Sequence, residues 1–251
     1  MIVAIANQKG GVGKSTTAQA VGSILHSKGD KVLFVDLDPQ GNLTYSLKGQ
    51  NTGKSIAEVL QEKNTALEAI QSTEGGDLIA HSPTLSGADL TLTQTGKEYR
   101  LREALEPIKS LYNWIIIDTP PSLGILTVNA LTAATRAIIT AQADIYSLQG
   151  IGQLHSTITA VKQYTNTELV VAGILLTRYN RRTILSRDIT STMRSIAAQI
   201  ETKLFTTKIR ENIAIKEAQA RQQSICTYAP KSNGCVDYRA FTKELIKELT
   251  K

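Results

Sequence analysis

The sequence predicts an α/β fold, a doubly wound, mostly parallel sheet flanked by helices. Short apolar runs rich in β-branched residues recur along the chain, as buried parallel strands require. Amphipathic stretches separate these runs, and this alternation favours right-handed crossovers within one doubly wound sheet. The candidate strands cover residues 2–6, 32–35, 78–80, 114–117, 137–140 and 169–176.

Three stretches between or after these runs carry apolar residues at helical spacing. The stripes are Ala18, Val21, Ile24 and Leu25; Leu101, Leu105, Ile108 and Leu111; and Tyr238, Phe241, Leu245 and Leu249. The last stripe alternates with lysines and glutamates, so we expect it to dock on the core rather than on an acidic membrane. The first strand begins at residue 2, which leaves no room for an N-terminal helix-turn-helix. We therefore expect a single domain over residues 1–251.

Composition points to an ordinary cytoplasmic globular protein, with 41% hydrophobic and 20% charged residues. No basic segment precedes the first apolar run, so no signal peptide is expected. No apolar run approaches the roughly 18–20 residues of a membrane span. Cys226 and Cys235 are too few for a disulfide framework. We expect them to be two free thiols in a reducing compartment.

Charge is distributed unevenly along the chain. Residues 1–125 carry a net charge of −2 and residues 126–251 carry +8. The densest segment, residues 178–221, holds 10 basic and 4 acidic residues. Such a surplus suits a polyanion or an acidic membrane, although taken alone it is more often just a solvated surface.

A glycine-rich segment follows the first strand and opens the first helix, which is the context that a P-loop requires. Its glycines allow backbone amides to surround phosphate oxygens. Lys14 can neutralise β- and γ-phosphate charge, and the Ser15 hydroxyl can bind Mg²⁺. The residues expected to contact the nucleotide are Lys9, Gly10, Gly11, Val12, Gly13, Lys14, Ser15 and Thr16.

Two features modify the usual P-loop pattern. Gln8 stands where that pattern places a glycine, and Lys9 adds a second cation early in the loop. The residues alone leave open whether Lys9 points at its own nucleotide or outward.

Aspartates follow two of the predicted strands. Asp118 ends one apolar strand, at the edge where α/β sheets place their ligands, and is expected to bind Mg²⁺ directly or through water. Asp36 and Asp38 follow another strand, and alternation points them in the same direction, towards the same magnesium–phosphate site. A turn-capping role for Asp38 before Pro39 is the alternative.

The segment from Lys9 to Ser15 resembles the deviant Walker A motif of the ParA/MinD ATPases. The Asp36–Asn42 stretch resembles the switch I motif of the same family. The resemblance implies a P-loop NTPase fold, ATP and Mg²⁺ as cofactors, and an ATP-dependent homodimer in which Lys9 acts on the partner's nucleotide. It also implies that Asp38 holds the attacking water and that Asp36 lies in the second shell of the metal.

Weaker similarity to the family extends over almost the full length. It covers residues 121–131, residues 228–232 and the segment from Arg210 to Ala218, and it implies that Arg210 contacts the nucleotide. Ala218-Gln219-Ala220-Arg221 departs from the usual Ala-Pro-Ser, which leaves the local backbone unpredicted.

ParA relatives bind DNA without sequence preference through basic residues of the C-terminal half. Carried onto this chain, the resemblance implies non-specific DNA binding, a ParB-like partner and a nucleoid-associated, cytoplasmic protein. The DNA-binding candidates are Arg178, Arg181, Arg182, Arg187, Lys208, Lys216 and Arg221. The alternative is a MinD-like ATPase, or one that positions another cargo. A metabolic P-loop kinase lacks support because no second substrate site is evident.

Overall fold

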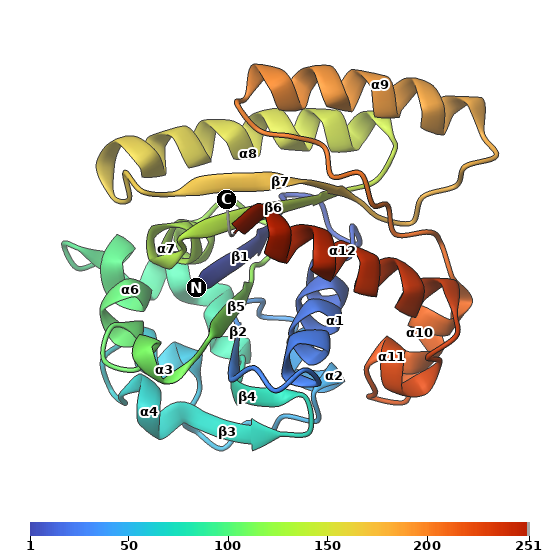
Figure 1. Ribbon diagram of the computed structural model, residues 1–251. Helices are drawn as coiled ribbons and strands as arrows, with labels where there is room; N and C mark the ends of the chain where they lie inside the picture. Colours follow the sequence, from blue (N-terminus) through green and yellow to red (C-terminus); the bar gives the residue numbers. More distant parts are fainter. Residues whose placement is uncertain (250–251) are drawn as a thin grey trace.

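The computed structural model describes residues 1–249 and is organised around a seven-stranded sheet (Figure 1). The strand order is β3-β4-β2-β5-β1-β6-β7, and all neighbours are parallel except β3 and β4. Because β1 lies between β5 and β6, the chain winds to both sides of it, which creates a ligand crevice at the carboxyl ends of the strands. The strands are β1 (Ile2–Ala6), β2 (Val32–Asp36), β3 (Ile70–Thr73), β4 (Gly76–Ile79), β5 (Trp114–Asp118), β6 (Arg136–Ala141) and β7 (Val170–Leu176).

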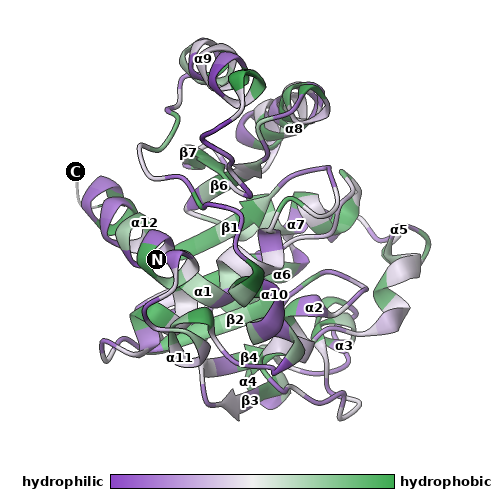
Figure 2. Cartoon of the chain, turned by 90° about the vertical axis from the view of Figure 1, so that its right-hand side faces the viewer, coloured by the Kyte–Doolittle hydropathy of each residue, from purple (hydrophilic) through white to green (hydrophobic). Residues whose placement is uncertain are grey.

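Helices cover both faces of the sheet, and Figure 2 shows the apolar strands enclosed between them. One layer consists of α1 (Lys14–His26), α2 (Asn42–Ser46), α10 (Ile213–Ala220), α11 (Ile225–Tyr228) and α12 (Asn233–Leu249). The other consists of α3 (Ile56–Leu60), α4 (Ala66–Ala69), α5 (Ala88–Thr91), α6 (Arg100–Leu105), α7 (Ile125–Ala133), α8 (Ile145–Tyr164) and α9 (Ile184–Gln199). Short 3₁₀ helices span Pro83–Gly87, Lys97–Tyr99 and Lys109–Leu111.

The strands contribute alternately to the two cores. In β1, Val3 and Ile5 face α1 and α12, whereas Ala4 and Ala6 face the layer that contains α7. Both sets are buried, as expected for parallel strands with helices on each face. This confirms the predicted fold class, and each of the six predicted strands overlaps an observed one.

The local structure differs from the sequence analysis in two places. The edge strand β3 was not predicted, because its sequence Ile70-Gln71-Ser72-Thr73 is polar and only partly buried. The stripe from Leu101 to Leu111 is not one helix. The helix α6 ends before Pro107, which cannot continue a helix, and Leu111 is half exposed in a 3₁₀ turn.

The C-terminal region confirms one expectation and overturns another. Tyr238, Phe241 and Leu245 of α12 are buried against α1, so the amphipathic helix docks on the core as predicted. Cys226 and Cys235 are not free thiols but form a disulfide bond between α11 and α12. The short connection between these helices brings their Cα atoms to 4.8 Å, which is within disulfide range.

Candidate nucleotide-binding site

The glycine-rich loop is fixed at the carboxyl ends of β1, β6 and β7. The Gln142 side chain donates to the Gly11 carbonyl at 2.8 Å, and the Thr177 hydroxyl donates to the Val12 carbonyl at 2.8 Å. Gly11 and Gly13 have φ values of 72° and 81°, a region that favours glycine. Because the Gly11 and Val12 carbonyls bind side chains outside the loop, the loop amides are left for the cavity. This arrangement suits an anion at the start of α1.

Lys14 lies inside this loop. The residue is only 6% exposed, and its ammonium group donates to the Lys9 carbonyl at 3.2 Å. Burial lowers the pKa of Lys14, while the charges of Asp118 and Asp38 act in the opposite direction. The loop therefore holds one cation where phosphates would bind.

Lys9 takes a different position. Its side chain leaves the loop and its Nζ lies 2.7 Å from Oδ2 of Asp144, with the Tyr146 ring 5.8 Å away. Asp144 is the N-cap of α8 and accepts a second hydrogen bond from the Ser147 amide at 2.8 Å. Burial acts to raise the pKa of Asp144, but the bonds from Lys9 and Ser147 outweigh it and lower that pKa. The two lysines of the motif are thus directed to separate sites.

Asp118 is a buried carboxylate without hydrogen-bond partners. Neither of its oxygens has one among residues 1–249, and the residue is fully buried. Burial, followed by the charge of Asp36, raises the pKa of Asp118 well above its ordinary value, whereas Ser15 and Lys14 lower it. An orphaned carboxylate beside a serine hydroxyl fits a hard cation such as Mg²⁺, which would supply the missing partner.

The magnesium site would need further ligands from the nucleotide and water. Among residues 1–249, no group of three or more His, Cys, Asp or Glu side chains could enclose a metal ion. Magnesium commonly takes only one or two protein oxygens together with phosphates and waters. Ser15 and Asp118 therefore suffice as the protein part of the site.

Asp36 lies beside Asp118, because their strands are paired at these two residues. Its Oδ2 accepts hydrogen bonds from the amide and hydroxyl of Thr44, at 2.8 and 2.7 Å, and its Oδ1 accepts from the Asp38 amide at 3.1 Å. Burial raises the pKa of Asp36 to about 6 against these hydrogen bonds, which favour the charged form. Asp36 thus organises the loop that follows β2, and this suits an indirect role at the metal.

Asp38 lines the same cavity as Lys14 and Ser15 and is 5% exposed. Its Oδ1 also accepts the Gln40 amide at 3.0 Å, so the turn-capping role and the cavity-lining position coexist. Gly41 completes the turn at a φ of 64°, where a Cβ atom would lie 2.2 Å from the His81 ring. The turn therefore requires glycine. It places the Asp38 carboxylate in the lining of the cavity that the P-loop also lines.

The cavity itself has a volume of about 590 Å³ and extends from the P-loop to α10. Arg210 lines it, and its guanidinium group forms hydrogen bonds of 2.9 and 2.6 Å with Asp237 of α12. Asp237 is a partner that the sequence did not suggest, because the two residues lie 27 positions apart. The ion pair holds Arg210 at the cavity wall.

Comparison with known proteins decides the family. A family model described as an AAA domain matches residues 1–171. The chain is 38% identical to the sporulation initiation inhibitor protein Soj of Bacillus subtilis, over 97% of each chain. It is 39% identical to the chromosome partitioning protein ParA of Myxococcus xanthus, over 99% of this chain and 89% of that one.

The chain belongs to the ParA/Soj family of partition ATPases. A solved structure of cobyrinic acid a,c-diamide synthase from Mycobacterium smegmatis, with an ATP analog and magnesium, is also similar. That structure shares 36% identity at a TM-score of 0.86 and covers 100% of this chain and 96% of its own. The protein is accordingly an ATPase that uses ATP and Mg²⁺.

The structure places the basic residues predicted for DNA in several local environments. Arg178 and Lys216 line the nucleotide cavity, and Arg178 pairs with Glu211 at 3.1 Å. Lys208 lies 4.1 Å from the centre of the Tyr179 ring, and Arg221 caps the end of α10. The loop before α9 and the start of that helix carry three exposed arginines, Arg181, Arg182 and Arg187.

Sequence reasoning missed one basic residue near these three. Arg194 is exposed on α9, seven residues after Arg187 and therefore on the same helix face. The signal that could have found it was this spacing.

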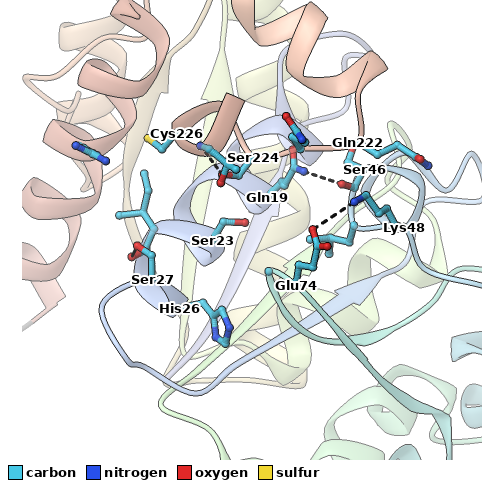
Figure 3. A pocket seen from close by; sticks show the side chains of 16 residues that line it. Gln19, Ser23, His26, Ser27, Ser46, Lys48, Glu74, Gln222, Ser224 and Cys226 are labelled. Atoms are coloured by element: carbon cyan, nitrogen blue, oxygen red, sulfur yellow. Dashed lines mark hydrogen bonds and ion pairs between the residues drawn. The ribbon is translucent and has the colours of Figure 1, made fainter. Parts of the chain in front are cut away.

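A smaller cavity of about 240 Å³ lies away from the P-loop, between α1, α2 and α11 (Figure 3). Gln19 donates to the Ser46 carbonyl at its edge, and Lys48 pairs with Glu74 at 3.3 Å. No residue predicted for nucleotide, metal or DNA lines it.

Among residues 1–249, no helix has both the length and the apolar composition needed to cross a membrane.

Proposed function

We propose that this chain is a single-domain partition ATPase whose Mg-ATP-bound form is a homodimer that binds DNA without sequence preference. A ParB-like centromere-binding partner stimulates hydrolysis, which releases the dimer from DNA. The protein acts in the cytoplasm, on the nucleoid. The names of the Soj and ParA relatives support the partition role.

The position of Lys9 carries this proposal. Its side chain is 30% exposed and points out of its own loop to Asp144, whereas the Lys14 side chain lies inside the loop. A lysine at this rim can reach a nucleotide held by a facing copy once the pair with Asp144 opens. Lys9 therefore completes the site of the partner, and dimerisation depends on the nucleotide.

Exposed apolar side chains support a partner on the same side of the molecule. Ile145 and Tyr146 begin α8 and are 59% and 71% exposed; Ile184 and Leu185 begin α9 and are 68% and 59% exposed. The two helices lie side by side and begin at the same end (Figure 1, Figure 2). Apolar residues at the starts of these two helices, with Tyr146 next to Lys9, suit a two-fold interface that removes them from water.

Within each site, the chain supplies charge and orientation. When bound, Mg²⁺ would neutralise phosphate charge. Ser15 and Asp118 would hold the metal, and Lys14 neutralises further phosphate charge. Asp38, fixed by its turn at the mouth of the loop, orients the attacking water. Movement of such a loop often limits turnover, so slow intrinsic hydrolysis and stimulation by a partner are expected.

Exposed arginines near α9 support DNA as the surface on which the ATPase acts. Arg181, Arg182 and Arg187 are neither buried nor part of the nucleotide cavity. Dimerisation doubles this modest patch, and phosphate neutralisation makes affinity rise steeply with the number of contacts.

A MinD-like membrane organiser is less well supported. Its membrane contact would need an exposed amphipathic C-terminal helix, whereas the apolar side of α12 is buried against α1 and β7. The experiment that separates the two functions is cosedimentation with random-sequence DNA and with anionic liposomes, with ADP or ATP, across a salt series. We expect salt-sensitive DNA binding with ATP alone, and binding to liposomes without binding to DNA would overturn the proposal.

A further inference from the structure

The last turn of α10 contacts the start of α1 through Gln219. The Gln219 side-chain amide donates a hydrogen bond of 2.8 Å to the hydroxyl oxygen of Thr16, 203 residues earlier in the chain. Both residues line the large cavity that the P-loop opens into. The contact therefore joins the phosphate-binding loop to a helix at the far wall of the cavity.

The direction of this hydrogen bond fixes the direction of another. A hydroxyl group has one hydrogen to donate and two lone pairs that accept. Because the Thr16 oxygen already accepts from Gln219, its own hydrogen is available to an acceptor in the cavity. Phosphate oxygens accept hydrogen bonds only, and charge-assisted bonds to them are the stronger kind.

We propose that Gln219 is a positioning residue that orients the Thr16 hydroxyl as a donor to the diphosphate part of the nucleotide. The inference rests on the P-loop role proposed above. Lys14 and Ser15 serve the terminal phosphates and the metal, so Thr16, one residue further along α1, is left for the phosphates that ADP and ATP share.

The backbone around Gln219 is held well enough for this task. Ala218 is 2% exposed, and Gln222, just past the helix, donates to the Tyr45 carbonyl at 2.9 Å. A proline at position 219, as in the usual Ala-Pro-Ser of the family, would have no amide to donate. The departure from the family pattern thus introduces a polar contact at the wall of the cavity.

The test compares two variants at this position by isothermal titration with Mg-ADP and Mg-ATP. Gln219→Met removes the donor at similar volume, and we expect about a fivefold loss of affinity, the same for both nucleotides. Gln219→Glu replaces the donor by a charged acceptor, which turns the Thr16 hydrogen away and repels phosphate. We expect a loss of more than about tenfold.

Two controls separate positioning from general support of the fold. Gln222→Asn shortens the side chain that donates to the Tyr45 carbonyl, and asparagine suits the left-handed backbone of position 222 (φ 51°). This variant should therefore leave nucleotide affinity within about twofold. In a Thr16→Val background, Gln219→Met should cause no further loss, because the hydroxyl that it orients is gone. Melting temperatures of all variants are measured in the absence of nucleotide.

Several results would overturn the inference. These are an unchanged affinity of Gln219→Met, an equal loss in Gln222→Asn, a full loss that persists in the Thr16→Val background, or a loss confined to ATP. Failure of the proposed P-loop role looks different, since Lys14→Ala would then still bind nucleotide.

Discussion

The carboxyl ends of β1, β2 and β5 contrast with the segment around the start of α9 in how their charged side chains are held. At the nucleotide site, Lys14, Asp36 and Asp118 are at most 6% exposed, and each faces charged neighbours. Near α9, Arg181 and Arg187 are exposed and, within residues 1–249, form no ion pair. We therefore expect single substitutions to abolish function in the first region and to reduce it gradually in the second.

The largest effect is expected for Lys14→Ala. Loss of the buried ammonium group leaves phosphate charge uncompensated, so affinity for Mg-ATP should fall about 100-fold or more. Isothermal titration measures this affinity, and the matched control is Lys28→Ala, an exposed lysine just past the C-terminal end of α1. If Lys14→Ala bound Mg-ATP nearly as tightly as the unmodified protein, single substitutions at the nucleotide site would not abolish function as expected.

Asp38→Ala tests hydrolysis separately from binding. Without the carboxylate that orients water, turnover should fall about 100-fold while ATP still binds. The ATP-bound dimer should then accumulate, which light scattering coupled to gel filtration detects. A monomeric Asp38→Ala protein at saturating ATP would contradict the role assigned to this residue.

The basic segment is tested by removing three of its arginines together. Arg181→Ala, Arg182→Ala and Arg187→Ala combined should lower DNA affinity roughly 10- to 1,000-fold and flatten its dependence on salt, because each lost phosphate contact reduces counterion release. The control is Lys28→Ala, Lys54→Ala and Lys63→Ala combined, which removes the same charge from the opposite half. Equal losses in both triple variants would mean that net charge, rather than the α9 segment, binds DNA.

Asp144→Asn tests the ion pair that holds Lys9. Asparagine still caps α8, but the pairing charge is lost, so Lys9 is released at a cost typical of exposed ion pairs. Dimerisation should therefore begin at an ATP concentration about two- to fivefold lower, as followed by light scattering. An unchanged or higher concentration would show that Asp144 does not compete with the partner.

The smallest effect concerns the stability of the nucleotide-free protein. Burial raises the pKa of Asp118 above its ordinary 3.8, so its carboxyl favours folding below that value and loses this contribution as the pH rises through the raised pKa. Asp118→Asn should then raise the melting temperature by about 2–5 °C near pH 8, and by less towards pH 4. It should also remove the additional stabilisation by Mg²⁺ in the presence of nucleotide.

The parts of the site that lie at strand ends were predictable from sequence. Apolar runs end at Asp36 and Asp118, and in a parallel sheet such ends meet at one edge. The partners of Lys9 and Arg210 were not predictable, because Asp144 and Asp237 reach them only through strand order and helix packing. Exposed arginines have no such constraint, so the surplus in charge did not predict which of them share a surface.

The sequence did not predict the disulfide bond or the edge strand, for different reasons. Two cysteines nine residues apart carry no pairing signal without the turn that brings α11 to α12. The strand β3 lacks an apolar pattern because, as an antiparallel edge, it buries little of its surface.

The central claim is that Lys9 completes the nucleotide site of a facing copy. Its most direct test mixes Lys9→Ala and Asp38→Ala proteins in equal amounts before ATP is added, and then measures hydrolysis. Each variant alone should be inactive. In a mixed dimer, one site keeps its own Asp38 and receives Lys9 from the partner, so the mixture should recover about a quarter of the original activity. A mixture as inactive as its components would contradict the claim, because Lys9 would then act on its own nucleotide.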